Sequence, residues 1–420
     1  MNLKKLAVVF SIVALALVLS SIVSSGNKTQ AAVTCSVPTL AYPTIQSAAS
    51  DPGCTQIDVA PGAYNETVVV NFPTTINGAQ VGNNDFVTRS ANPAGESTVN
   101  GSNPTASVGV FTINATNVTI NGFTVKHTVT IGAAMGITVT GSGSNSTIVN
   151  NIFDTIASPD TGSQGTAQAI YLTAGGPDNV KIENNEMKNV HSNRSAKGIL
   201  VGDNGGPNPS QNVQVKGNSI HDITSDTRGA YGLSVASVTN VSGLQVLNNN
   251  IDNLTGGGWA HAIGLEGDTP GVIVTGNCIS DIVDLTVSLP EDSLAVFFEA
   301  NPSFGSAEVH QNNFTNVSYG IAVHPALVSA FPASLVDGEN NWWGSASGPG
   351  PVGPGTGAKV SPGVDYTPWL LFPAAGGACG MAEATNKDQC KNGGWQTVVR
   401  ANGSPFKNQG DCIQYANTGK

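Results

Sequence analysis

One segment pattern recurs six times along the middle of the chain, and it constrains the fold more than any other feature. The copies begin 34, 33, 31, 28 and 35 residues apart, and each combines alternating apolar residues with asparagine. A repeat of this length is typical of a solenoid, in which each coil covers the apolar face of the next. The copies are NSTIVNNIFDTI from Asn145, NVKIENNEMKNV from Asn179, NVQVKGNSIHDI from Asn212, GLQVLNNNIDNL from Gly243, GVIVTGNCISDI from Gly271 and SAEVHQNNFTNV from Ser306.

A second strand-like segment lies between successive copies and begins with glycine or alanine. Its copies are GITV at Gly136, AIYL at Ala169, GILV at Gly198, GLSV at Gly232, AIGL at Ala262, AVFF at Ala295 and GIAV at Gly320. Apolar residues at alternate positions indicate strands, and strands at a regular spacing stack on their counterparts in the next coil. We therefore predict an all-β chain that forms a single-stranded, right-handed parallel β-helix of about 8–9 coils.

One asparagine keeps the same offset in every copy of the first pattern. We expect an architectural role, because asparagine tolerates the left-handed backbone of a tight corner and stacked amides can bond from coil to coil. A following column of Asn and Asp, beginning at Asn189, is expected to satisfy backbone groups at the next corner. The first column comprises Asn151, Asn185, Asn218, Asn249, Asn277 and Asn312.

The chain begins with the features of a secretory signal peptide. Lys4 and Lys5 precede an apolar stretch over residues 6–19, and small residues lead to Ala31 and Ala32. We predict a signal peptide over residues 1–32 and a secreted or cell-surface protein with no transmembrane segment after cleavage. An uncleaved membrane anchor is the alternative, because the apolar run can be extended to Val23.

Charge and cysteine content agree with an exported protein. The formal net charge is −11, which makes nucleic acid an unsuitable partner. Six cysteines in an exported chain favour disulfide bonds, and we expect Cys35 to pair with Cys54 and Cys390 with Cys412, although fifteen pairings are possible. Cys278 stands alone in the middle of the chain, and we expect it to be a free thiol.

The two ends of the repeat region carry segments that suit caps. YPTIQSAASDPGCTQIDVAPGAYNE, from Tyr42, resembles the opening of pectin-lyase-like β-helix proteins, where a T-I-Q-x-A helix is followed by I-x-V-x-P-G-x-Y-x-E. It predicts a cap helix around residues 45–49. The NNWWG segment at residues 340–344, with the Gly/Pro-rich stretch after it, is similar to the closing segment of secreted β-helix repeat proteins. The tryptophans there are expected to plug the last coil, or alternatively to stack on sugar rings.

We predict a β-helix domain over residues 33–374, and the resemblance covers residues 42 to about 369 of it at the level of fold. The cysteine-containing tail, residues 375–420, is similar to a short C-terminal module of bacterial secreted proteins, and a surface-attachment or packing role is the hypothesis for it. The chain lacks the arginine-containing lyase motif, the tandem-Asp and Gly-His-Gly set of polygalacturonases and the Gly-Arg-Pro-Trp segment of pectin methylesterases. The resemblance therefore implies a fold and a preference for polysaccharide, without a mechanism.

Candidate site residues come from stacking the second strand. The position after each strand is Gly202, Ala236, Glu266, Glu299 and His324, which predicts one outward-facing column. Strands of neighbouring coils lie about 4.8 Å apart, so Glu266, Glu299 and His324 are expected on consecutive rungs. Two carboxylates at that spacing can share a proton or bind a cation, and one of them can pair with the histidine.

Each outcome has a functional counterpart. A carboxylate separation near 5 Å suits a retaining glycosidase, which makes Glu266, Glu299 and His324 the candidate catalytic residues. Several acids together suit Ca²⁺, for which the candidate ligands are Asp203, Glu266, Asp268 and Glu299. Elimination on a uronic acid would also need a base, and Arg228, His261 and His324 are the candidates. Outward-facing acids on a solenoid can equally be ordinary surface residues.

Two functions follow from these observations. The first is a secreted protein that binds or modifies polysaccharide or cell-envelope glycan, acting as a lyase or glycoside hydrolase if it is an enzyme. The second is a non-catalytic surface, adhesion or spacer protein. Phe297 and Tyr171 flank the acidic column and favour carbohydrate. We expect a monomer in either case, with calcium as the one cofactor to consider.

Overall fold

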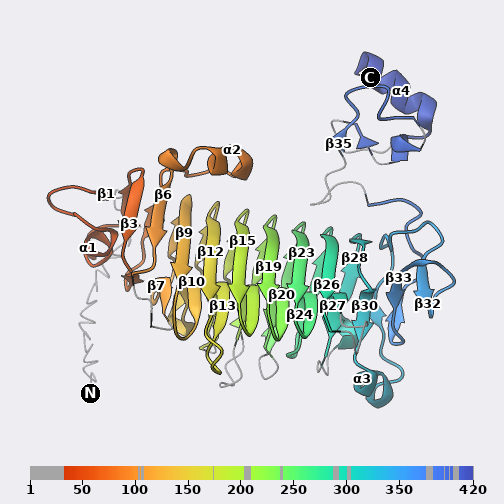
Figure 1. The fold of residues 1–420 in the computed structure, drawn as a ribbon, viewed down its shortest axis with the longest axis horizontal. Coiled ribbons are helices and arrows are strands. Elements are labelled where there is room, and N and C mark those ends of the chain that lie inside the picture. Colours follow the sequence, from red (N-terminus) through yellow and green to blue (C-terminus); the bar gives the residue numbers. More distant parts are fainter. Residues whose placement is uncertain are drawn as a thin grey trace, which may run out of the picture. The chain divides into compact units, whose positions relative to one another are not determined.

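The computed structural model confirms the predicted parallel β-helix (Figure 1). The predicted signal peptide, residues 1–32, lies outside the described residues. The structure describes residues 33–102, 105, 108–173, 175–202, 210–236, 240–286, 293–299, 304–374, 382–391, 393–396, 398–400 and 406–419.

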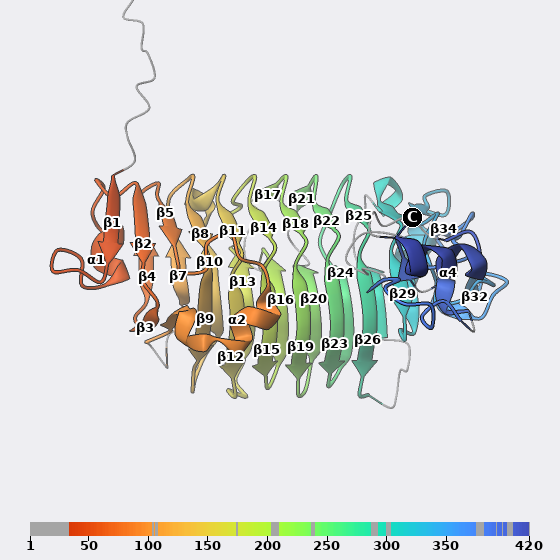
Figure 2. The ribbon, with the colours of Figure 1, turned by 90° about the horizontal axis from the view of Figure 1, so that it is seen from above.

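Three parallel sheets form the walls of the helix, and each coil in the middle of the chain contributes one strand to each sheet in turn (Figures 1 and 2). The 12-stranded sheet holds the short strands of the repeat, which precede the asparagine found at the same offset in every copy. Its strands are β1 (Thr34–Val37), β2 (Gln56–Val59), β5 (Thr75–Asn77), β8 (Thr119–Asn121), β11 (Thr147–Val149), β14 (Lys181–Glu183), β18 (Gln214–Lys216), β22 (Gln245–Leu247), β25 (Ile273–Thr275), β28 (Glu308–His310), β31 (Val336–Asp337) and β34 (Val364–Asp365).

The nine-stranded sheet follows that asparagine in each coil. Its strands are β3 (Gly62–Asn65), β6 (Ser97–Asn100), β9 (Phe123–Thr128), β12 (Ile152–Ser158), β15 (Glu186–Ser192), β19 (Ser219–Ser225), β23 (Asn250–Gly256), β26 (Cys278–Asp284) and β29 (Asn313–Thr315).

The 11-stranded sheet carries the second strand predicted from the sequence, and the candidate site lies on it. Its strands are β4 (Val68–Val70), β7 (Gly109–Ile113), β10 (Ala134–Val139), β13 (Thr166–Leu172), β16 (Ser195–Val201), β20 (Gly229–Val235), β24 (Trp259–Leu265), β27 (Ser293–Phe298), β30 (Tyr319–Val323), β33 (Gly357–Val360) and β32 (Pro349–Pro351). Short strands β17 (Ser210–Gln211) and β21 (Val241–Ser242) pair outside these sheets.

The interior is built from equivalent residues stacked coil on coil. Ile148 of β11 pairs in register with Ile120 and Ile182, and all three are fully buried. β-branched side chains suit such strands, and burying each one contributes about 1.5–3 kcal/mol. The repeat therefore specifies its own register, because a slip by one residue would turn the apolar side chains toward solvent.

The asparagine column is a buried ladder, which confirms its structural role. The Asn218 side chain is 1% exposed, its Nδ2 donates to Ile182 O (2.9 Å) and Asn249 Oδ1 (3.0 Å), and its Oδ1 accepts from Asn185 N (2.9 Å). The left-handed residue is one position earlier than expected: φ is +51° at Asn184 and +66° at Gly217. The ladder asparagines themselves are not among the residues with positive φ.

Both ends are capped as the sequence predicts. At the front, α1 (Ile45–Ala49) covers the first coil, and Glu66 accepts from the amides of Ile45 (3.0 Å) and Gln46 (2.9 Å) at its N-terminus. At the back, the Trp343 side chain is fully buried, and its ring centroid lies 5.3 Å from that of Phe314. Trp343 therefore plugs the last coils and does not stack on a sugar.

Helix α2 (Phe86–Ala91) lies over the nine-stranded sheet near β9 and β12 (Figure 2). Its Arg89 is 2% exposed and pairs with Glu96 through two contacts of 2.9 and 2.8 Å. The same guanidinium donates to Asn150 O (2.6 Å) and Phe123 O (3.2 Å). All these donors find acceptors, so the buried charge fixes the helix to the sheet.

Both predicted disulfides, Cys35–Cys54 and Cys390–Cys412, are present. The expectation of a free thiol at Cys278 is wrong, because this residue is disulfide-bonded. Cys278 begins β26 at a partly exposed, outward-facing position, where a second cysteine can reach it. A buried position in the apolar interior would have kept it isolated.

The tail has a small apolar cluster of its own, which contains Cys390, Cys412 and Phe406. It includes α4 (Gln409–Thr418) and the paired strands β35 (Ala382–Glu383) and β36 (Val398–Val399). Helix α3 (Pro325–Ala330) follows β30. Within the described ranges, none of the helices has the length and apolar character needed to cross a bilayer.

Candidate functional site

The candidate site lies on the outward face of the 11-stranded sheet. Small residues at the strand centres fix which neighbours face outward. A Cβ added to Gly198 would lie 2.7 Å from both Gly232 O and Ile220 Cγ2, so only a small residue fits there. The residues on either side of this column, such as Lys197 and Leu200, are partly exposed while Ile199 and Val201 are buried.

The structure places the predicted acidic column in register. Leu265 pairs with Val235 on one side and with Phe298 on the other. Glu266, Glu299 and His324 follow these strands, and the amides of Glu299 and His324 donate to Leu265 O (3.1 Å) and Phe298 O (2.8 Å). The two glutamates are therefore one rung apart, about 4.8 Å along the solenoid.

A buried tyrosine, itself bonded to a partly exposed tryptophan, holds Glu266 in place. Tyr231 is 4% exposed, and its hydroxyl donates to Glu266 Oε1 at 2.6 Å. The same hydroxyl accepts from Trp259 Nε1 at 2.5 Å. Gly229 makes room for this arrangement, since a Cβ there would lie 2.1 Å from Trp259 Nε1 and 2.5 Å from the Tyr231 ring.

The second glutamate has a different environment. Loss of hydration raises the pKa of Glu299, the neighbouring Glu266 carboxylate raises it further, and His324 acts in the opposite direction. Burial also raises the pKa of Tyr231 well above its usual value, and Glu266 adds to this effect. Tyr231 therefore stays protonated as a hydrogen-bond donor to Glu266, and Glu299 takes up a proton at a higher pH than an ordinary glutamate does.

A second outward column contains basic side chains. Lys197, Tyr231 and His261 are consecutive partners in the strand register, and Lys197 Nζ lies 5.1 Å from the centroid of the Tyr231 ring. His261 is 5% exposed and lies between the rings of Tyr231 (5.3 Å) and Phe297 (4.9 Å). Burial lowers the pKa of His261 to about 3 and lowers the pKa of Lys197, an effect that Glu266 partly opposes.

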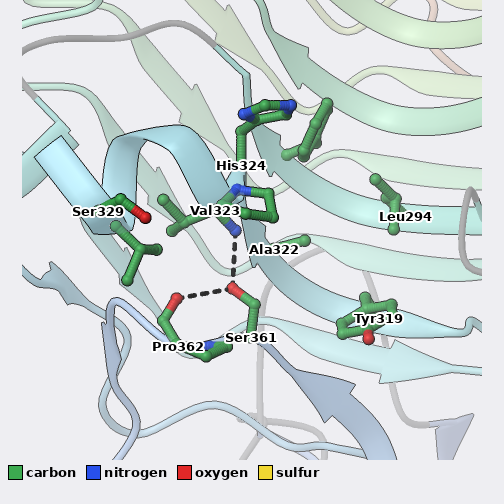
Figure 3. A pocket seen from close by; sticks show the side chains of 11 residues that line it. Leu294, Tyr319, Ala322, Val323, His324, Ser329, Ser361 and Pro362 are labelled. Atoms are coloured by element: carbon green, nitrogen blue, oxygen red, sulfur yellow. Dashed lines mark hydrogen bonds between the residues drawn. The ribbon is translucent and has the colours of Figure 1, made fainter.

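His324 occupies the next rung and lines the neighbouring cavity beside α3. Its Nδ1 accepts from Ala326 N at 3.2 Å and caps helix α3. Figure 3 shows its ring pointing away from Ser361, whose hydroxyl accepts from Val323 N (2.8 Å) and donates to Pro362 O (2.9 Å). The predicted third member of the catalytic set is therefore a neighbour of the glutamates with a structural task of its own.

Three cavities lie along this face and share lining residues. The central one, about 440 Å³, is lined by both glutamates, Lys197, Tyr231, Trp259 and His261, with Ser195, Arg228 and Phe297. A cavity of about 390 Å³ shares Lys197 and Glu266 with it, and includes Gln168, Tyr171 and Ser234. On the other side, Phe297 also lines an apolar cavity of about 400 Å³ beside α3 (Figure 3).

The predicted calcium ligands come together only in part. Asp203 lies outside the described residues. Asp268 lines neither of the cavities that hold Glu266, and its Oδ2 accepts from Asn240 Nδ2 at 3.4 Å. In the described part of the chain, no three His, Cys, Asp or Glu side chains gather into a metal-binding group. Calcium binding stays a prediction.

Sequence reasoning missed Lys197, Tyr231 and Trp259 as site residues. On this sheet the prediction stacked only the position that follows each strand, and it named His261 as a possible base without placing it in a column. A signal was available, because Lys197, Tyr231 and His261 occupy the same offset before the small residue in SAKGILV, GAYGLSV and WAHAIGL. Stacking that position would have placed them in one column beside the acids.

The fold and this exposed face define a right-handed parallel β-helix repeat protein. A family model described as "Right handed beta helix region" matches residues 168–326, which run from β13 to α3 and include both glutamates and the whole lining of the central cavity. No curated protein matches the sequence.

Among solved structures, the chain is similar to the Dettilon tailspike protein (gp208) at 11% sequence identity and a TM-score of 0.26. The match covers 64% of this chain and 61% of the tailspike, so the chain spans under two thirds of that protein's length. Function therefore has to be argued from the site itself.

Proposed function

We propose that the protein binds polysaccharide along the outward face of the 11-stranded sheet and hydrolyses it at Glu266 and Glu299. The observation that carries this proposal is the unequal pair of carboxyl groups on adjacent rungs. Tyr231 hydrogen-bonds to Glu266, whereas the raised pKa of Glu299 favours its protonated form. Pairs of acids whose environments differ in this way divide the roles of acid and nucleophile.

The rung spacing of the two strands that carry the glutamates, about 4.8 Å, is compatible with a retaining mechanism. Carboxyl groups about 5 Å apart act as acid and nucleophile on one glycosidic bond. Glu299 would give its proton to the leaving oxygen while a Glu266 oxygen attacks the anomeric carbon and forms a glycosyl ester. Glu299 would then take a proton from water, which attacks the same carbon and releases Glu266. Tyr231 would hold Glu266 in position throughout.

The surroundings suit a sugar chain. Trp259, Tyr171 and Phe297 line the cavities around the acids, and their rings can pack against the apolar faces of sugars. The three connected cavities reach from β10 to β30, seven strands, or roughly 29 Å at the usual strand spacing. This length accommodates several sugar units.

Incubation with a panel of neutral and acidic polysaccharides, with and without Ca²⁺, tests the proposal by the appearance of new reducing ends. We expect Glu266→Gln and Glu299→Gln each to lower turnover by about 10²–10⁴-fold. Glu308→Gln is the matched control, because Glu308 is exposed on the 12-stranded sheet. Absence of cleavage and binding across the panel, or full activity of both variants, would refute it.

Lys197 supports a second candidate, elimination on a uronic acid. Its lowered pKa suits a general base that removes a proton next to a carboxylate. Of the bases predicted from the sequence, His261 has a pKa of about 3, too weak for this task, and His324 caps α3. Ultraviolet absorbance of unsaturated uronates, lost in Lys197→Met, would identify elimination in place of hydrolysis.

A non-catalytic surface or spacer protein is the remaining candidate. The continuous asparagine ladder and capped ends support a stable rod that displays its outer faces. Export of the chain is part of our proposal in either case, and the two disulfides agree with an oxidising compartment. Cell fractionation would test it: a freely soluble extracellular protein that cleaves polysaccharide excludes the spacer role.

A further inference from the structure

Two of the side chains in the cavity beside the acids carry buried polar atoms without a partner. Gln168 is 4% exposed and Ser234 is 1% exposed, and both line the cavity of about 390 Å³. Gln168 Oε1 and Ser234 Oγ make no hydrogen bond within the described residues. An unpaired buried polar atom costs about 1–3 kcal/mol, so its presence on a cavity wall calls for a binding partner.

The strands hold these atoms in fixed positions. Gln168 pairs in register with Lys197, and its Nε2 donates to Thr166 Oγ1 at 2.8 Å, which turns Oε1 away from that contact. Ser234 is the register partner of Leu200 on one side and Gly264 on the other. Gln168, Ser234 and Lys197 therefore all line one preformed cavity, and the first two of these side chains each hold an unpaired oxygen atom.

We infer that this cavity is a binding site for one neutral, hydroxyl-rich sugar ring. The Gln168 amide oxygen accepts a proton from a sugar hydroxyl, the Ser234 hydroxyl can donate or accept, and Lys197 donates to a ring or hydroxyl oxygen. The partly exposed ring of Tyr171 and the side chain of Leu200, in the next outward column, supply an apolar surface.

The charges of the cavity favour a neutral ligand over an acidic one. An ionised carboxylate has no proton for Gln168 Oε1, whereas every hydroxyl has one. Glu266 lines the same cavity and Glu299 lies one rung beyond it, so both would repel an anion there. Among the described residues that line this cavity, Lys197 is the one basic side chain, and Glu266 already acts on it electrostatically.

This inference rests on the proposed function and extends it, because it identifies the chemical class of one sugar of the substrate. It lies on the β13 side of the glutamates, so it would hold the part of a polysaccharide that precedes the cleaved bond in one direction along the rod. The binding itself, however, can be measured without cleavage.

The test uses D-galactose and D-galacturonate, which differ only in the group at carbon 6, together with D-glucose and D-mannose. Saturation-transfer NMR on the full-length mature protein is expected to show saturable binding of a neutral hexose, with galactose ahead of galacturonate. Gln168→Leu and Ser234→Ala should each weaken binding about five- to tenfold, as expected for one hydrogen bond. Gln211→Leu and Ser280→Ala, on other surfaces of the solenoid, are the matched controls.

Thermal unfolding separates a ligand site from a structural one. Because the two atoms are unpaired in the free protein, removing them should leave the melting temperature unchanged or higher while binding falls. Tighter binding of galacturonate, absence of saturable hexose binding, or unaltered binding in both variants would overturn the inference. The same titration with Glu299→Gln tests sugar binding independently of hydrolysis. Hexose binding should persist in this variant whether or not Glu299 is catalytic.

Discussion

Replacing Tyr231 with phenylalanine tests the arrangement of the site most directly. The change removes one oxygen atom that joins Trp259 to Glu266, through contacts of 2.5 and 2.6 Å. Trp259 Nε1 loses its acceptor, and Glu266 loses a donor to a charged group. Hydrogen bonds to charged groups contribute about 1.5–3 kcal/mol, and water entering the cavity can recover part of the loss. We expect Tyr231→Phe to lower the free energy of unfolding by about 2 kcal/mol.

Urea unfolding at neutral pH measures this change, with Tyr64→Phe as the control. The Tyr64 hydroxyl donates to Ala60 O at 2.8 Å, and this bond is exposed to solvent, so its removal should cost under about 0.5 kcal/mol. A double-mutant cycle of Tyr231→Phe with Trp259→Phe should give a coupling energy of about 1 kcal/mol. Equal stability of the two tyrosine variants, or no coupling, would refute the proposed network.

The alkaline side of the stability curve gives a second measure of the same residue. Tyrosine ionises near pH 10 when unfolded, whereas burial and Glu266 raise the pKa of Tyr231 well above 10 in the folded protein. The stabilisation from the neutral phenol is complete below pH 10 and declines as the pH rises above it. Tyr231→Phe should therefore lose stability less steeply above pH 10 than the unaltered protein does.

Three further predictions concern acid stability, the asparagine ladder and the buried ion pair. Burial lowers the pKa of His261 from 6.5 to about 3, so the stability that comes from its neutral ring is complete above pH 6.5 and is lost as the pH falls. His261→Gln should therefore reduce the loss of unfolding free energy between neutral pH and about pH 4 by about 3 kcal/mol, measured by urea unfolding. Asn218→Ala should cost about 3–5 kcal/mol because it leaves buried backbone groups unpaired, whereas Asn253→Ala on the exposed ladder should cost under about 1 kcal/mol. Arg89→Leu should cost about 3–5 kcal/mol because it leaves the Glu96 carboxylate, 3% exposed, without its counter-charge, and similar melting temperatures of variant and parent would contradict this.

Much of the fold could be predicted from the repeat. Alternating apolar residues at a regular spacing require parallel stacking, and Ile148 with its partners in neighbouring coils shows the result. The cap helix at residues 45–49, the buried Trp343 and two disulfides were also predicted, because each depends on a local pattern. Cys278 was not, because its bonding depends on which distant segment reaches the outer face.

The candidate site also has one part that the sequence predicts and one part that it does not. The alignment of Glu266 with Glu299 follows from strand register alone, since each rung repeats the one before. Tyr231, which positions Glu266, comes from the preceding coil, and Trp259 comes from the start of the strand that leads to Glu266. Their contact depends on side-chain directions and on the space left by Gly229. Sequence spacing does not encode those directions.

The sequence by itself therefore determined a stacked parallel β-helix with architectural asparagines and two acids on adjacent rungs, because period and register are one-dimensional properties of a repeat. Only the tertiary structure decided which atoms lack partners and which carboxyl group is driven toward its protonated form. Burial, hydration and hydrogen bonding depend on all the coils around a residue. For this reason Glu299 is distinguished from Glu266, and the cavity at Gln168 and Ser234 emerges, only once the coils are stacked.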